Sequence, residues 1–184
     1  MRKVYTRTGD DGTTGLLFGG RVGKQTPGPS AYGAVDEAVA ALGLARAETE
    51  RGSELDELLV AVQRELFVVG AELATPGDKR ERLEPGVSRT TAEMVDALEP
   101  IIDRVTERFE APQEFVVPGE NRIAAALDVA RTVVRRAERE AVAATSAGWL
   151  DADSHVVPYL NRLADLVYTL ARWQEGGFRP VRTA

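Results

Sequence analysis

Three segments of the sequence carry polar residues whose types and spacing suit the binding of an anionic ligand. The first is a glycine- and threonine-rich stretch at residues 6–15, with Lys24 after it. Glycines let backbone N–H groups turn toward one point and let a phosphate approach closely, and threonine hydroxyls add donors. The stretch can wrap a triphosphate, although its composition also fits a flexible tail. It is not a Walker A loop, because residues 19–24 have one residue too few before the lysine.

The second segment is an arginine-rich stretch in the second half of the chain. Its charged members are Arg131, Arg135, Arg136, Glu138 and Arg139. At helical spacing, Arg131 and Arg135 fall on one stripe with Asp128, beside an apolar face. Arginines at the edge of a core are held rigidly and suit bidentate binding of phosphate oxygens. The alternative is a solvated charged face with pairs between successive turns.

The third segment is a polar row near the C-terminus. Its members are Asn161, Asp165, Tyr168 and Arg172, at offsets of four, three and four. Such a row on one side of a helix faces a ligand, another subunit or solvent.

The composition excludes several other kinds of chemistry. The chain has no cysteine, and therefore no disulfide or thiolate metal site, and His155 is its single histidine, expected to be partly exposed near a helix start. A net charge of −6 disfavours binding to nucleic acid. No apolar run approaches the roughly 20 residues of a membrane-spanning helix, and residues 1–5 lack a secretion signal. We expect a cytoplasmic protein whose anionic ligand is held by a local cluster of cations.

Five amphipathic helices are predicted to position these segments. Apolar residues recur at three-and-four spacing over residues 30–50, 53–74, 88–108, 120–146 and 154–175. Ser30 and Ser88 are the expected N-caps of the first and third helices. The chain of 184 residues is predicted to be all-α, a five-helix bundle in one domain, with a glycine-rich loop at 1–29, the bundle at about 30–176 and a tail at 177–184. The charged stretch at 76–86 is expected to be a surface loop.

Taken together, the segments resemble the PduO-type ATP:cob(I)alamin adenosyltransferases. The resemblance begins in the N-terminal loop, whose matching residues are Thr6, Arg7, Thr8, Gly9, Asp10, Asp11, Gly12, Thr13, Thr14 and Gly15. Further blocks follow in the same order at residues 31–37, 115–119, 130–139 and 161–165. The resemblance covers nearly the whole chain, and the arginine block is its most specific part.

The resemblance implies a homotrimer that binds ATP and corrinoid where neighbouring subunits meet. The loop and Lys24 would wrap the triphosphate, with Mg²⁺ held mainly by the phosphates. The helical residues implied to complete the nucleotide site are Arg135, Arg136, Glu138, Arg139 and Asn161. Asp36 would pair with Arg131, and Phe115 would sit by the corrin. The chain departs from the family pattern at Glu120, where a second glycine is usual, and at Asp128, where a histidine often stands.

The implied reaction transfers the 5′-deoxyadenosyl group of ATP to cob(I)alamin, forming adenosylcobalamin and releasing triphosphate. Cob(I)alamin is a strong nucleophile with no proton to remove, so the reaction needs no general base. It does need positive charge at the leaving oxygens, for which Arg135 is the main candidate. The implied partners are a flavin-type reductase and an adenosylcobalamin-dependent mutase. Two alternatives remain: a carrier that binds ATP and adenosylcobalamin and delivers the cofactor to a mutase, and a purely structural bundle.

Overall fold

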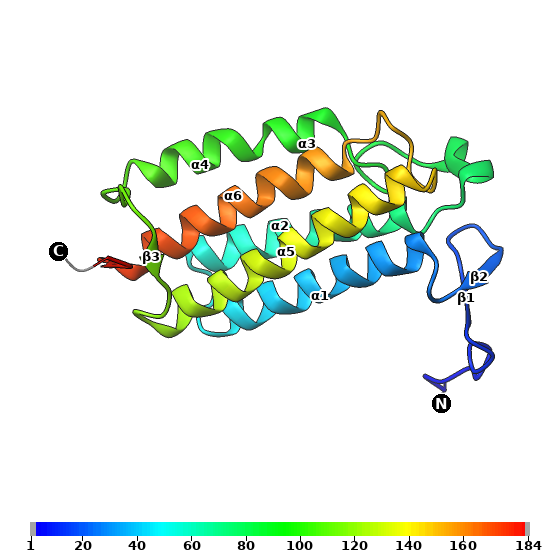
Figure 1. The fold of residues 1–184 in the computed structure, drawn as a ribbon, viewed down its shortest axis with the longest axis horizontal. Coiled ribbons are helices and arrows are strands. Elements are labelled where there is room, and N and C mark those ends of the chain that lie inside the picture. Colours follow the sequence, from blue (N-terminus) through cyan, green and yellow to red (C-terminus); the bar gives the residue numbers. More distant parts are fainter. Residues whose placement is uncertain (1–2, 183–184) are drawn as a thin grey trace.

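The structure is a computed structural model that describes residues 3–182. The described chain is mostly helical (Figure 1). The predictions for residues 1–2 and 183–184 lie outside this range. The described chain has six α-helices: α1 (Pro27–Ala47), α2 (Glu54–Leu73), α3 (Ala92–Asp96), α4 (Leu98–Thr106), α5 (Arg122–Ser146) and α6 (Val156–Glu175). A 3₁₀ helix, η1, spans Gly77–Arg82. Two antiparallel strand pairs complete the fold: β1 (Thr13–Gly15) with β2 (Arg21–Gly23), and β3 (Val116–Val117) with β4 (Arg179–Pro180).

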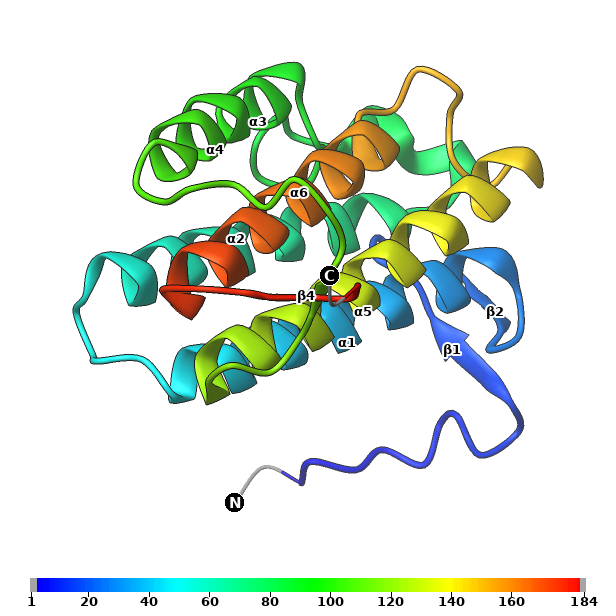
Figure 2. The same ribbon diagram turned by 60° about the vertical axis from the view of Figure 1, so that its left-hand side comes forward.

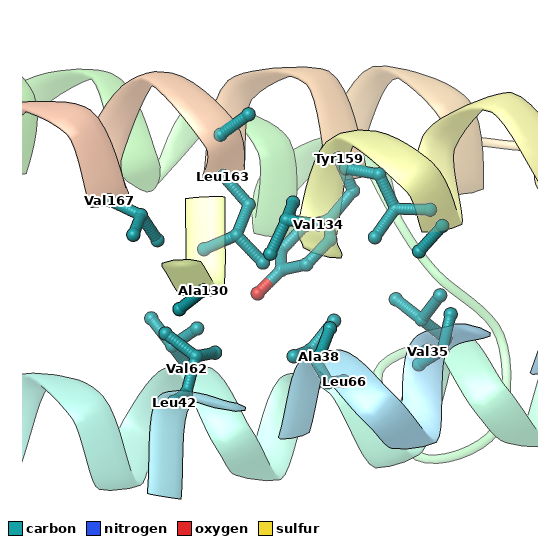
Figure 3. Close-up of a cluster of buried hydrophobic side chains, with 14 of the residues drawn as sticks. Val35, Ala38, Leu42, Val62, Leu66, Ala130, Val134, Tyr159, Leu163 and Val167 are labelled. Atoms are coloured by element: carbon teal, nitrogen blue, oxygen red, sulfur yellow. The ribbon is translucent and has the colours of Figure 1, made fainter. Parts of the chain in front are cut away.

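The hydrophobic core lies between α1, α2, α5 and α6 (Figure 3). Each of these helices turns one apolar stripe inward, as the three-and-four spacing requires. Core residues that illustrate this are Val35, Ala38 and Leu42 on α1, Val62 and Leu66 on α2, Ala130 and Val134 on α5, and Tyr159, Leu163 and Val167 on α6. Within residues 3–182, no helix has the length and apolarity needed to cross a membrane.

The third predicted helix is interrupted, so that α3 and α4 stand where one helix over 88–108 was expected. Pro100 has no N–H to donate to the carbonyl of Asp96, and its ring crowds that carbonyl, which breaks the helical ladder. The predicted cap Ser88 is also wrong: its hydroxyl instead accepts from the Glu84 N–H at 2.9 Å. Thr91 caps α3. The described chain therefore has six α-helices where five were predicted.

The first helix begins three residues before the expected cap, Ser30. Thr26 is the N-cap of α1, and Pro27 and Pro29 occupy its first turn, where backbone N–H groups have no intrahelical partner to lose. Ser53 is the N-cap of α2, and its side chain accepts from the Asp56 N–H at 3.2 Å.

The described part of the predicted tail, residues 177–182, folds back across the bundle. Gly176 ends α6 in the left-handed conformation, with a φ of 67°. β4 then pairs with β3, and the Val181 N–H donates to the Phe115 carbonyl at 2.9 Å. Figure 2 shows this strand crossing in front of the helices. The C-terminal segment is thus attached to the connection that precedes α5.

Candidate functional site

The N-terminal loop folds into a hairpin that lies beyond the first turn of α1 (Figure 1). A tight turn precedes the hairpin, in which the Gly12 N–H donates to the Gly9 carbonyl at 3.2 Å. Lys24 closes this turn, since its Nζ donates to the Gly9 carbonyl at 2.9 Å and its backbone N–H donates to the Gly12 carbonyl at 2.9 Å. A side chain at Gly9 would meet the Thr13 carbonyl at 3.0 Å. The same Cβ would lie 3.3 Å from Lys24 Nζ, so the absence of a side chain at Gly9 lets the lysine approach the backbone closely.

A second set of hydrogen bonds stiffens the same hairpin. The Asp11 carboxylate accepts from both the backbone N–H and the hydroxyl of Thr13, at 2.9 and 2.7 Å. The Thr13 hydroxyl bond is the main cause that lowers the pKa of Asp11 below its ordinary value. Arg21 donates to the Thr13 hydroxyl oxygen at 2.6 Å and to the Thr8 carbonyl. The hairpin thus brings two cations, Arg21 and Lys24, to a glycine-rich backbone, as polyphosphate binding requires.

The segment around η1 holds the hairpin on the bundle. The Leu17 N–H donates to the Ala74 carbonyl at 2.9 Å, and Lys79 Nζ donates to the Phe18 carbonyl at 3.0 Å. The Arg82 guanidinium lies 4.3 Å from the centre of the Phe18 ring, a cation–π contact. The sequence predicted only a surface loop at 76–86, because its clustered charges carry no sign of the backbone carbonyl and aromatic ring they contact.

On α5 and α6, the structure brings some of the predicted nucleotide residues together. Glu138 accepts from Asn161 Nδ2 at 2.8 Å, which joins the two helices. Arg139 donates to the carbonyl of Arg135 at 3.1 Å, and both side chains lie on the exposed surface. Arg136 forms an ion pair with Glu37 of α1.

The implied pair between Asp36 and Arg131 is not formed within the described chain. Arg131 Nε instead lies 3.5 Å from Asp128 Oδ1, one turn earlier on α5. Asp36 is exposed on α1. Within one subunit, Asp128 therefore lies beside Arg131 in place of Asp36, and the pair implied by the resemblance stays a prediction.

Phe115 lies at the opposite end of the bundle from the hairpin, beside β3 (Figure 1). Its side chain is 88% exposed and borders a cavity of about 580 Å³. The lining residues are Pro112, Gln113, Glu114, Phe115, Tyr168, Val181 and Arg182. Tyr168, from the polar row on α6, thus faces the same space as Phe115. One chain carries the loop and this aromatic cavity at separate ends.

The polar row on α6 does not act as one face. Asn161 bonds to α5, Asp165 pairs with Arg162 at 3.2 Å, and Tyr168 borders the cavity. Arg172 is buried and pairs with Asp128. Spacing identified the row, but the direction that each side chain takes depends on what packs against it.

The chain is thus a helical protein that carries a glycine-rich hairpin with Arg21 and Lys24 at one end and an aromatic cavity at the other. Residues 4–174 match the model of the cobalamin adenosyltransferase family, and the chain belongs to that family. The predicted family and class of enzyme are confirmed by this match and by the relatives that follow.

Known proteins of this family match the chain over nearly its whole length. The chain is 42% identical over 175 residues to a corrinoid adenosyltransferase of Citrobacter freundii, covering 95% of this chain and 96% of that protein. It is 40% identical over 195 residues to the corrinoid adenosyltransferase of Mycobacterium tuberculosis, covering 97% and 96%. A solved variant of the PduO-type ATP:corrinoid adenosyltransferase from Lactobacillus reuteri, complexed with cobalamin and ATP, superposes with a TM-score of 0.88 at 32% identity, covering 98% of this chain and 100% of that one.

Proposed function

We propose that this protein transfers the 5′-deoxyadenosyl group of ATP to cob(I)alamin, forming adenosylcobalamin and releasing triphosphate. The observation that carries the proposal is the close match, at a TM-score of 0.88, to an enzyme complexed with both ATP and cobalamin. The hairpin adds independent support, because it presents Lys24 and Arg21 beside a glycine-rich backbone.

The reaction needs position and charge more than proton transfer. The cobalt of cob(I)alamin attacks C5′ of the ribose, the C5′–O bond breaks, and its electron pair leaves on the triphosphate. No proton moves in this step, so the protein must align the two substrates and neutralise the leaving oxygens. We assign that charge to Lys24 in the loop and to Arg135, Arg136 and Arg139 on α5. Phe115 and its cavity would receive the corrin.

We further propose that each active site is completed by a neighbouring subunit of a homotrimer. The support is the separation of the hairpin and the Phe115 cavity within one chain (Figure 1). A second copy would bring one subunit's hairpin to another's cavity. The exposed Asp36 would then reach Arg131 across that interface, which accounts for the missing pair inside one subunit.

Mg²⁺ is proposed to enter with ATP, since phosphate oxygens are ligands that it prefers. Among residues 3–182 there is no group of three histidine, cysteine or acidic side chains placed to hold a metal ion. The exposed carboxylate of Asp10 in the loop is chemically compatible with a magnesium–phosphate complex. A flavin-type reductase that provides cob(I)alamin, and an adenosylcobalamin-dependent mutase that receives the product, are the proposed partners in the cytoplasm.

The test is the visible spectrum of chemically reduced cobalamin mixed anaerobically with the protein, Mg²⁺ and ATP over many turnovers. We expect adenosylcobalamin in excess over protein, and a loss of about a hundredfold or more in Arg135→Ala, the effect of removing one well-placed donor. Unchanged turnover in Arg135→Ala would refute the role of that arginine. Binding of ATP without any conversion would instead favour the carrier.

A further inference from the structure

A buried cluster of charged side chains joins the first half of α5 to the last turns of α6. Its members are Asp128, Arg131, Arg172 and Glu175, and we call it the α5–α6 ion cluster. The side chains of Arg172, Glu175 and Asp128 are only 2%, 1% and 7% exposed. Arg131 is 29% exposed and is the one member that reaches the surface. Burial is the main cause that raises the pKa of Glu175.

Arg172 is the centre of the cluster. Its Nη2 donates to Asp128 Oδ2 at 2.5 Å and to Glu175 Oε1 at 2.9 Å. Its Nε lies 2.8 Å from Glu175 Oε2, an ion pair without a hydrogen bond. A guanidinium held by two carboxylates in this way cannot rotate freely, because its planar fork sets the directions of its donors. Arg172 therefore fixes the Asp128 carboxylate through one of its two oxygens.

The second oxygen of Asp128 faces Arg131. Asp128 Oδ1 and Arg131 Nε are 3.5 Å apart, both are buried, and within the described chain neither has a hydrogen-bond partner. Buried polar atoms without partners cost free energy, so a hydrogen bond between these two atoms is favourable. Closing the gap by roughly half an ångström would form a hydrogen bond of ordinary length.

The cluster also touches the aromatic cavity. The Arg172 guanidinium lies 5.0 Å from the centre of the Tyr168 ring, within range of a cation–π contact. Tyr168 borders the cavity together with Phe115. One buried arginine therefore contacts both the carboxylate beside Arg131 and one wall of the space assigned to the corrin.

A buried ion pair is weak evidence for stability, because apolar side chains of the same volume serve a fold equally well. What an ion cluster adds is a defined position for a charged group. In this cluster the group that reaches the surface is Arg131, on the helix that carries the arginine block.

We propose that Asp128 and Arg172 are positioning residues for adenosyl transfer, an inference that rests on the proposed function. Asp128 holds the Arg131 guanidinium in its reactive orientation. Arg172 fixes Asp128 and, on its other side, the ring of Tyr168. Loss of Asp128 therefore affects kcat, and loss of Arg172 affects both kcat and the KM for the corrinoid.

The experiment compares Asp128→Asn with Asp56→Asn in the anaerobic adenosylation assay. Asp56 is a matched control: it is also a helical carboxylate, 8% exposed against 5% for Asp128, and it pairs with Arg46 at 3.2 Å far from the arginine block. We expect Asp128→Asn to lower kcat by about tenfold or more, as misplaced catalytic groups do. Asp56→Asn should keep kcat within about twofold after correction for the folded fraction.

Arg131→Ala completes a double-mutant cycle with Asp128→Asn. If Asp128 acts through Arg131, adding Asp128→Asn to Arg131→Ala has no further effect on kcat. If the two residues act independently, the fold-losses in kcat of the two single variants multiply in the double variant. Equal kcat in wild type and Asp128→Asn, or multiplying effects, would overturn the inference. A wild-type protein that forms no adenosylcobalamin would instead count against the proposed function itself.

Arg172→Lys keeps the test decisive should Asp128→Asn fail to fold. Lysine retains the charge but loses the planar fork that holds Asp128 and stacks on Tyr168. We expect Arg172→Lys to lower kcat and to raise the KM for cobalamin by about threefold, with the KM for ATP nearly unchanged. Wild-type values of kcat and of the KM for cobalamin would overturn the proposed role of Arg172.

Discussion

Glu72, near the end of α2, joins two connections at the end of the bundle that carries the hairpin. Its carboxylate accepts from the Thr90 N–H and from the Ser154 hydroxyl, both at 2.6 Å. Glu72 and Thr90 are each 1% exposed, so water cannot replace a lost partner there. Glu72→Leu removes the acceptor and leaves the Thr90 N–H buried and unpaired.

The size of the effect follows from these two bonds. Hydrogen bonds to a charged group contribute about 1.5–3 kcal/mol each, and the apolar leucine offsets part of the loss. We expect Glu72→Leu to lower the free energy of unfolding by about 3 kcal/mol. In a chain of this length, that corresponds to a fall in Tm of about 6–12 °C. Glu72→Gln keeps one acceptor and gains a donor for the Ser154 oxygen, so it should cost about 1 kcal/mol.

Thermal unfolding and urea titration, both followed by circular dichroism, measure these differences. The control is Glu57→Leu, at an exposed position on the same helix, where a change of no more than about 0.5 kcal/mol is expected. Two results would refute the reasoning: a Tm of Glu72→Leu equal to that of wild type, or a cost of Glu72→Gln as large as that of Glu72→Leu.

Three further predictions test other parts of the structure. Asp36→Asn should lower the rate of adenosylation; a wild-type rate in the anaerobic assay would show that the proposed pair between subunits is not needed. Gly28→Ala would place a Cβ inside the contact distance of the Trp149 ring. We expect a loss of about 1–3 kcal/mol in urea titration and an altered tryptophan fluorescence, and an unchanged midpoint would contradict the contact. Thr13→Val should raise the pKa of Asp11 toward 3.8 in a carbon-13 NMR titration. A carboxyl whose pKa is lower in the folded than in the unfolded state stabilises the fold above its unfolded pKa, and this contribution is lost as the pH falls through the folded pKa. Thr13→Val should therefore lose that contribution above about pH 4. An unmoved pKa of Asp11 would exclude the Thr13 hydroxyl as the cause of the shift.

The helices that form the core were predictable from the sequence because their signals are local. The spacing of apolar residues identified α2 to within one residue at each end. Where two local signals compete, the sequence is less decisive. Ser88 and Thr91 are both good caps, and only the turn that Ser88 makes with Glu84 leaves Thr91 to begin α3.

The family was also recognisable from the sequence, because its motifs are short runs whose order along the chain does not depend on packing. The match over residues 4–174 agrees with that reading. The particular role of each motif residue stays a prediction, to be tested by the variants described above.

Only the tertiary structure decided which charged groups meet. Arg172 pairs with Asp128, 44 positions earlier, and Lys79 binds the carbonyl of Phe18, 61 positions earlier. Helical spacing shows which face of a helix a residue occupies, but its partner depends on how helices distant in sequence pack together. For that reason the sequence determined the core helices, the arginine stripe and the family, whereas the ion cluster, the contacts of Lys79 and Arg82 with Phe18 and the pairing of β4 with β3 required the folded chain.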